Sequence, residues 1–228
     1  MIPLRDTIPS RHRPVMTWLI ILVTLAVFLY QLKQLEFDPE TYQHLLGQFG
    51  LIPESFRGRL PVLDPAAWFP FVSYMFLHGG WMHAIGNLWA LWLFGDNVED
   101  RMGPGRFLLF YLISGVAAGL VHFYSDPLSP SVTIGASGAI AGVMGAYFVM
   151  FPSARIVTLI PVFFIPLFLE IPALVYLGFW LLSQIYSFML SRGGADVSNI
   201  AWTAHIGGFL AGLILHRLFL RTRRKYYY

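Results

Sequence analysis

The sequence predicts an all-α membrane protein in which six helices cross the bilayer, and two observations carry this prediction. First, 57% of the 228 residues are hydrophobic and only 12% are charged, whereas a soluble domain carries about a quarter charged residues. Second, the apolar residues fall in long runs: Val15 to Leu32 contains only Thr17, Thr24 and Gln31 as polar residues. A run of about 18 or more apolar residues is typical of a spanning helix.

Turn-forming residues separate the expected spans. The sequence from Met102 to Gly105 and the prolines at 127 and 130 are two such breaks. The six expected spans are approximately residues 15–32, 81–95, 106–124, 136–151, 171–190 and 202–220. The chain then divides into an N-terminal segment (residues 1–14), a membrane domain (15–220) and a basic tail (221–228).

Two connecting segments need their own interpretation. Residues 33–80 contain charges, prolines and an apolar aromatic section, and we expect them to form a long first outer loop that is partly embedded in the membrane interface. Residues 156–169 are apolar but are interrupted by Pro161 and Pro166. Six spans with a cytoplasmic N-terminus place 11 basic residues inside and 4 outside, as membrane topology favours. We therefore expect 156–169 to be interfacial, or a non-spanning lead into the fifth helix.

Composition and charge exclude several function classes. The chain has no cysteine, which excludes disulfides, thiolate zinc sites and thiol nucleophiles. The net charge is +3, but the basic residues flank the first and last apolar runs, as topology-setting residues do. No basic stretch is interleaved with aromatic residues, so we expect the lipid bilayer, and not nucleic acid, as a partner.

The first candidate for chemistry is Ser137, which lies between small residues at the start of the fourth span. The first backbone N–H groups of a helix have no partner within the helix. Together with the helix dipole they favour a developing oxyanion. The alternative is a motif for close helix packing, because Gly138 and Gly142 form a GxxxG pair.

The second candidate is His205, just inside the sixth span. Ionisable residues at membrane depth are costly and are functional hypotheses by default, although a hydrogen bond to a neighbouring helix is the alternative. With six spans, the fourth and sixth helices both begin at the outer face, so Ser137 and His205 lie at similar depth. Small residues at spacing four let the two backbones approach closely: Gly138, Gly142, Ala141 and Gly145 on one helix, and Ala204, Gly208 and Gly212 on the other.

The second span adds His83 and Asn87. Their spacing of four places both side chains on one helical face. An amide or a neutral imidazole can donate a hydrogen bond to an oxyanion. The alternatives are an interhelical hydrogen bond for this pair and simple hydration of His78 and His83 near an interface.

Taken together, these motifs resemble those of the rhomboid family of intramembrane serine proteases, and the resemblance extends from the first span to the sixth. The matching stretches are Phe76-Leu77-His78, residues 83–87 (His-Ala-Ile-Gly-Asn), Glu99 with Gly103 and Phe107, residues 135–138 (Gly-Ala-Ser-Gly) and residues 204–208 (Ala-His-Ile-Gly-Gly). The resemblance implies that Ser137 is the nucleophile and His205 the general base and later the acid. It also implies an oxyanion hole formed by His83, Asn87 and the Ser137 N–H.

The resemblance carries further expectations. Glu99, Gly103 and Phe107 would shape the inner turn between the second and third spans. The partners would be transmembrane protein substrates, cleaved near their outer ends without a metal or cofactor. Some rhomboids carry an aromatic residue one turn after the serine that supports the histidine, but here that position is Ala141. The ring must then be held otherwise, and a neighbouring aromatic side chain is one candidate.

No third member of a triad is evident. Asp126 and Asp196 lie in outer loops without a route to His205, and a buried carboxylate would be costly, so we expect a Ser-His dyad. Because a lipid-exposed helix hides its carbonyls, we expect substrates with helix-weakening residues.

Three alternatives stay open at this point. One is a catalytically inactive rhomboid-like protein that binds membrane clients, although such proteins usually lack the serine or the histidine. Another is a transporter or metal channel that uses His78, His83, His122 and His205, although carboxylates are absent from the spans apart from Glu170 at a boundary. The third is a membrane scaffold. The compact chain and short loops favour a bacterial plasma membrane with both termini in the cytoplasm, and they leave the oligomeric state open.

Overall fold

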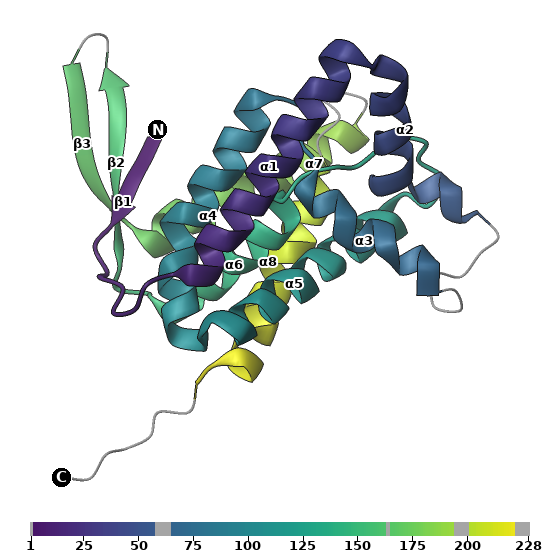
Figure 1. Ribbon diagram of the computed structural model, residues 1–228. Coiled ribbons are helices and arrows are strands. Elements are labelled where there is room, and N and C mark those ends of the chain that lie inside the picture. The colour runs from purple at the N-terminus through teal and green to yellow at the C-terminus, as the bar shows by residue number, and fades with distance from the viewer. Residues whose placement is uncertain (1, 58–64, 163–164, 194–200, 222–228) are drawn as a thin grey trace.

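The computed structural model describes residues 2–57, 65–162, 165–193 and 201–221, and Asp196 and residues 222–228 of the expected tail lie outside this part. Six long helices cover the six expected spans (Figure 1). They are α1 (Val15–Phe37), α4 (Trp81–Met102), α5 (Pro104–Ser125), α6 (Ser137–Met150), α7 (Ala173–Arg192) and α8 (Trp202–Phe219). By length and composition, α1, α5 and α7 are able to cross a membrane, and α6 is a shorter apolar helix. The count of six spans stays a prediction.

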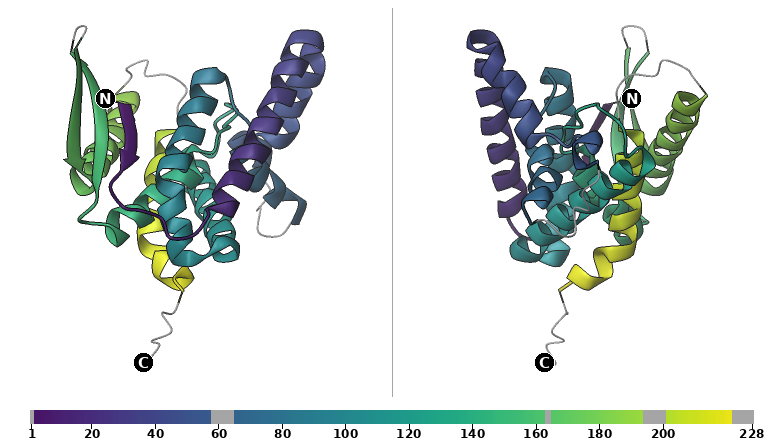
Figure 2. Two further views of the ribbon diagram at one scale, coloured as in Figure 1. Left: turned by 60° about the vertical axis from the view of Figure 1, so that its left-hand side comes forward. Right: turned by 90° about the vertical axis from the view of Figure 1, so that its right-hand side faces the viewer.

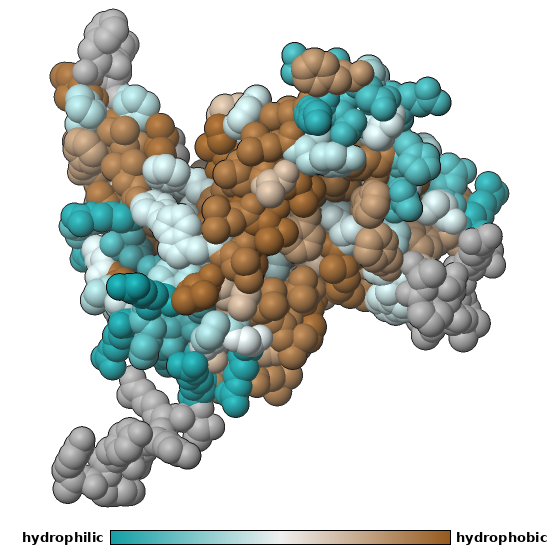
Figure 3. All heavy atoms as spheres, in the orientation of Figure 1, coloured by the Kyte–Doolittle hydropathy of each residue, from teal (hydrophilic) through white to brown (hydrophobic). Residues whose placement is uncertain are grey.

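The surface of the molecule is hydrophobic where lipid would contact it. In Figure 3 a hydrophobic band lies between hydrophilic residues gathered over α2 (Pro39–Phe49) and around the start of α1. Large apolar side chains are exposed along the outer helices, such as Leu22 (59%) on α1 and Phe179 (64%) on α7. Exposed apolar surface of this extent marks an interaction with another apolar medium, which fits a protein embedded in a bilayer.

At the centre of the bundle, α8 packs most extensively against α6 and also against α5, while α1 and α7 lie on opposite flanks (Figure 2). A Cβ atom built on Gly212 would overlap the carbonyl oxygen of Gly142, and one on Gly208 would overlap that of Gly138. The predicted close approach of the two small-residue rows is therefore confirmed. Glycine at these positions brings the starts of α6 and α8 side by side.

The turn at the opposite end of the bundle fixes α1 and α4 relative to each other. The buried Glu99 carboxylate accepts hydrogen bonds from the Met16 N–H (2.9 Å), the Thr17 N–H (2.7 Å) and the Thr17 hydroxyl (2.8 Å). These donors belong to the first turn of α1, where N–H groups lack helical partners. Gly103 follows with a φ of +79°, and Phe107 is fully buried beside it. The three residues therefore shape this turn as the resemblance implied.

The long first connection is folded and packs beside α1 and α5. Its described residues contain α2, α3 (Phe69–Ser73) and short 3-10 helices at Pro53–Phe56, Pro65–Trp68 and Tyr74–Phe76. The Asp38 carboxylate accepts a hydrogen bond from the Thr41 N–H (3.0 Å) and thereby caps α2. That this first connection, residues 33–80, is partly embedded in the membrane interface stays a prediction.

The expectation of an all-α fold is wrong in one region. The strands β1 (Ile2–Asp6), β2 (Arg155–Val162) and β3 (Ile165–Pro172) form an antiparallel sheet in the order β1-β2-β3. The described residues 156–162 and 165–169 thus belong to two paired strands, and β3 leads directly into α7 at Ala173, as the expectation of a non-spanning lead into the fifth helix requires. Whether the segment is interfacial stays a prediction. Pro161 and Pro166 face each other near its tip, where they oppose helix formation, and β1 supplies an additional strand from the distant N-terminal segment.

Asp6 anchors β1 to the helices. Its carboxylate accepts hydrogen bonds from the Tyr147 hydroxyl (2.5 Å) on α6 and from the Asn97 amide (2.8 Å) on α4. Burial at this position, opposed by the hydrogen bond from Tyr147, raises the pKa of Asp6 to about 6. The N-terminal segment is therefore part of the folded structure and not a loose extension.

Candidate active site

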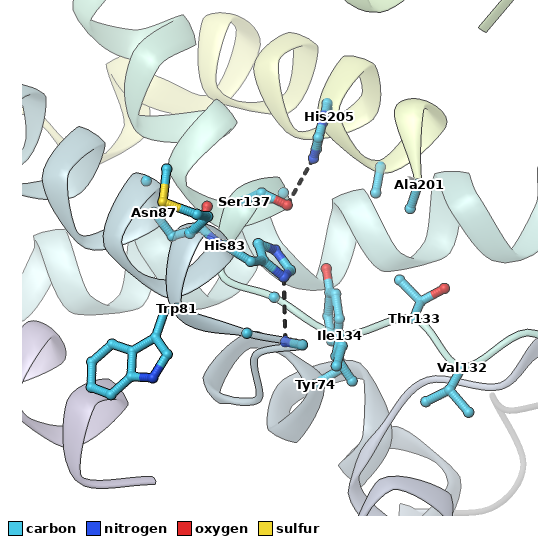
Figure 4. A pocket seen from close by; sticks show the side chains of 17 residues that line it. Tyr74, Trp81, His83, Asn87, Val132, Thr133, Ile134, Ser137, Ala201 and His205 are labelled. Carbon is cyan, nitrogen blue, oxygen red and sulfur yellow. Dashed lines mark hydrogen bonds between the residues drawn. The ribbon is translucent and has the colours of Figure 1, made fainter. Parts of the chain in front are cut away.

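Ser137 and His205 meet where α6 and α8 begin. Ser137 is the first residue of α6, and His205 lies in the first turn of α8. The Nε2 atom of His205 lies 2.8 Å from the Oγ atom of Ser137, and the two side chains point toward each other in Figure 4. The structure thus brings together the two residues that topology alone placed at similar depth, at a distance suited to proton transfer.

The loop before α6 holds Ser137 in place through backbone contacts. The Gly135 N–H donates to the Tyr74 carbonyl (2.9 Å), and Leu51 and Thr133 exchange two backbone hydrogen bonds. Gly135 has a φ of +127°, a backbone conformation that only glycine adopts readily. The loop therefore delivers the chain to the start of α6 with its first N–H groups facing away from the helix body.

His83 and Asn87, both from α4, converge over this loop. A Cβ on Gly135 would lie 2.6 Å from Nε2 of His83 and 3.6 Å from Nδ2 of Asn87. The Gly79 N–H donates to Nδ1 of His83 (3.4 Å), so the neutral ring carries its proton on Nε2. Figure 4 shows both side chains beside Ser137. Two side-chain donors and the start of a helix thus surround one position.

His78 is buried in the protein, which disfavours the alternative of simple hydration at an interface. It is only 1% exposed, and its Nε2 atom lies 3.0 Å from Nδ2 of Asn87. The Asn87 amide therefore donates one hydrogen to His78 and keeps its second for another acceptor. The Gln31 side-chain oxygen accepts from the His78 N–H (2.9 Å) and fixes this backbone in turn.

The imidazole of His205 is held on its other sides by α7 and α8. Its Nδ1 atom lies 2.8 Å from Oε1 of Gln184. The Trp180 ring lies 6.0 Å away and is tilted by 33°, and the Trp202 ring contacts it edge-on at 6.0 Å. Ala141 is fully buried, and these two tryptophans lie against the imidazole, as the candidate of a neighbouring aromatic side chain requires.

Two cavities adjoin the serine and histidine. One, of about 900 Å³, lies between the loop 132–135, the start of α4 and the start of α8. The other, of about 550 Å³, lies between α4 and α7 and is lined by Trp89, Tyr176 and Trp180. Ile2 and Pro3 of β1 also line it, and the Pro3 carbonyl accepts a hydrogen bond from the Trp89 indole (2.7 Å). Both cavities therefore leave open space beside Ser137 and His205.

Other polar residues considered from the sequence are used elsewhere. His122 bonds Thr203 (3.0 Å) and Thr133 (2.8 Å) and so ties α5 to α8 and to the loop before Ser137. Asp126 makes no hydrogen bond to His205. In the part of the chain that the structure describes, no group of three or more His, Cys, Asp or Glu side chains is arranged to hold a metal ion.

Sequence reasoning missed Gln184, Trp180 and Trp202 as parts of this site. The available signal was the spacing of Trp180 and Gln184, which are four residues apart and so share one face of α7. Gln184 is also a buried amide, 7% exposed, in a largely apolar helix. No motif marks it, because its role depends on a contact with another helix.

The family model described as "Rhomboid domain" matches residues 65–222. The chain is 32% identical over 201 residues to "Rhomboid protease GluP" of Bacillus subtilis, covering 88% of this chain and 34% of that protein. It is 34% identical over 217 residues to mouse "Rhomboid-related protein 2", covering 92% and 67%.

A further relative is "Rhomboid protease GlpG" of Klebsiella pneumoniae, 32% identical over 130 residues, which cover 57% of this chain and 41% of that protein. The chain spans 34% of the length of GluP and 51% of that of "Rhomboid-like protein 11, chloroplastic" of Arabidopsis thaliana. The relatives therefore include bacterial, plant and animal proteins.

Proposed function

We propose that this chain, which belongs to the rhomboid family, is an intramembrane serine endopeptidase. It would hydrolyse peptide bonds in or near transmembrane segments of other membrane proteins by a Ser-His dyad. The observation that carries the proposal is the 2.8 Å contact between Oγ of Ser137 and Nε2 of His205. That contact lies beside two cavities in a protein whose outer surface is apolar.

The proposed reaction follows from the atoms around Ser137. The Ser137 hydroxyl attacks the substrate carbonyl carbon while its proton passes to Nε2 of His205. The carbonyl oxygen becomes an oxyanion. The available hydrogen-bond donors are the Ser137 N–H, the Asn87 amide and the Nε2–H of the neutral His83 ring. The His205 imidazolium then gives its proton to the leaving amine. Water hydrolyses the resulting ester by the same steps, and no residue in the scheme requires a metal or cofactor.

Access to Ser137 would be lateral, from the lipid. The cavity between α4 and α7 supports this route because it extends from Ser137 and His205 to the exposed aromatic residue Trp89. A substrate must leave its helical conformation to present a carbonyl. We therefore expect cleavage of segments weakened by Gly or Pro near the membrane surface. Equally fast cleavage of a strong poly-Leu segment would contradict this part of the proposal.

The test is cleavage of a helix-weakened transmembrane substrate in liposomes by wild type, Ser137→Ala and His205→Ala. We expect cleavage by wild type alone. If wild type is inert on several such substrates while it still binds them, the chain is an inactive client-binding protein of the same family. If either variant cleaves as fast as wild type, the assignment of the dyad is wrong.

A further inference from the structure

The Gln184 side chain contacts the ring nitrogen of His205 that faces away from Ser137. The side chain reaches inward from α7, is 7% exposed and ends 2.8 Å from Nδ1 of His205. The opposite ring nitrogen contacts Ser137 at the same distance. A continuous chain of hydrogen bonds therefore runs from α7 through the imidazole to the serine.

The orientation of the Gln184 amide follows from its other contacts. Its nitrogen lies 3.2 Å from the Trp180 carbonyl and 2.9 Å from the Ser183 hydroxyl. A backbone carbonyl only accepts hydrogen bonds, so the NH₂ group, and not the oxygen, must face it. The Ser183 hydroxyl gives its own hydrogen to the Trp180 carbonyl (2.6 Å) and accepts from the amide. The side-chain oxygen of Gln184 is thereby left for His205.

This orientation selects one tautomer of the histidine. A carbonyl oxygen cannot donate, so the 2.8 Å contact requires a proton on Nδ1. In the neutral ring Nε2 then carries the lone pair that accepts the Ser137 proton. We infer that Gln184 is a positioning residue that fixes His205 as a base toward Ser137, through a hydrogen bond to Nδ1. This inference rests on the proposed function, and it adds Gln184 to the Ser137–His205 dyad as an uncharged supporting residue.

An amide suits this location better than the carboxylate of a conventional triad. A charged side chain at membrane depth is costly, and Gln184 and the inner face of α7 lie in an apolar bundle. The amide oxygen accepts a hydrogen bond from neutral imidazole and, more strongly, from the imidazolium formed during the reaction. It provides orientation without a buried charge.

Kinetics of three variants test this role. Gln184→Leu removes the acceptor at similar size, and we expect kcat to fall about 10- to 100-fold with little change in KM, because a hydrogen bond that strengthens in the transition state is lost. Gln184→Glu keeps an acceptor, so it should retain most of kcat. Its negative charge should also move the acidic limb of the pH profile to higher pH. A purely structural role predicts no such shift.

Ser183→Ala provides a milder variant in case Gln184→Leu does not fold. It removes one anchor of the amide and should lower kcat by about two- to fivefold, within the range of a weak hydrogen bond. Ser191→Ala removes an equivalent hydroxyl from the exposed end of α7, where the Ser191 hydroxyl donates to the Phe188 carbonyl (2.7 Å). We expect Ser191→Ala to match wild type.

The deciding measurement is ¹⁵N NMR of histidine-labelled protein in detergent, with the His205 signals assigned by comparison with His205→Ala. Wild type should carry the proton on Nδ1, and Gln184→Leu should show loss of this preference. This readout is independent of proteolysis, so a failed cleavage assay would remove the proposed function without hiding the tautomer. A wild-type proton on Nε2, or an unchanged tautomer and unchanged kcat in Gln184→Leu, would overturn the inference.

Discussion

The α6–α8 pair and α7 differ sharply in how they are packed, although both contribute to the site. Ten consecutive residues of α6, Gly138 to Tyr147, are buried, and α8 lies on it with glycine against backbone. In α7 only Ala173, Leu177 and Gln184 are buried, and most of its large apolar side chains face outward. Ser137 and His205 therefore belong to a tightly packed pair, while their support from Gln184 comes from a helix with few protein contacts.

Different helices therefore meet the two demands of the proposed reaction. The nucleophile and base need fixed geometry, which close backbone packing provides. The substrate needs an entrance from lipid, and the cavity between α4 and α7 adjoins the less tightly packed helix.

The largest effect should come from Gly212→Ala. The added methyl group would overlap the Gly142 carbonyl oxygen, so α6 and α8 must separate, at a cost of about 3 kcal/mol in the free energy of unfolding. Thermal unfolding in detergent measures it. Gly105→Ala is the matched control because its Cβ meets nothing within 4 Å, and it should be neutral or slightly stabilising. Equal unfolding midpoints for the two variants would contradict the close packing of α8 against α6.

Asn87→Ala should lower kcat by about 100-fold with a small change in KM, because it removes one donor to the oxyanion. Steady-state kinetics on a reconstituted substrate provide the measurement. Asn97→Ala is the matched control: it removes another buried amide from α4, one that bonds Asp6 and Asp96. That variant should lose stability and keep kcat, and the reverse pattern would argue against the assigned donor.

Asp6 should make the stability of the protein depend on pH. Burial raises its pKa to about 6, so the folded state binds its proton more tightly than the unfolded state does. The free energy of unfolding therefore falls as pH rises from about 4 to about 6 and then levels off. Asp6→Asn keeps an acceptor for Tyr147 and Asn97 but does not titrate. At pH 8 it should be more stable than wild type by about 1 kcal/mol, after allowance for partial exposure, and the advantage should vanish near pH 4.

The smallest effect should come from Phe179→Ala on α7. The side chain is 64% exposed and faces lipid, so its removal should change the free energy of unfolding by less than about 0.5 kcal/mol. Unfolding in detergent and in liposomes checks this. A loss comparable with that of Gly212→Ala would mean that α7 is packed as tightly as the central pair.

The residues of the candidate site that lie in short local motifs could be predicted from the sequence. Ser137, His205, His83 and Asn87 each lie in a short motif at the start of a helix, and a consistent topology put them at the same depth. All four line one cavity. The small-residue rows also predicted which helices would approach most closely, because only glycine and alanine permit backbone contact there.

The parts that sequence reasoning missed depend on distant contacts. The sheet requires residues 2–6 to pair with residues 155–162, and neither segment shows by itself that the other is its partner. Gln184 carries no motif, and its contact with His205 appears only when α7 is placed against α8. The choice between a buried and a hydrated His78 stayed open for the same reason, because its burial comes from contact with Phe28 of α1 and with Asn87.

The most direct test of the central claim is labelling of purified protein with a fluorophosphonate, followed by mass spectrometry of the adduct. The compound reports an activated serine without requiring a substrate to enter from lipid. We predict a single adduct on Ser137 in wild type, loss of that adduct in His205→Ala, and slower labelling in Gln184→Leu. Labelling at another serine, or labelling of Ser137 at an unchanged rate without His205, would contradict the account.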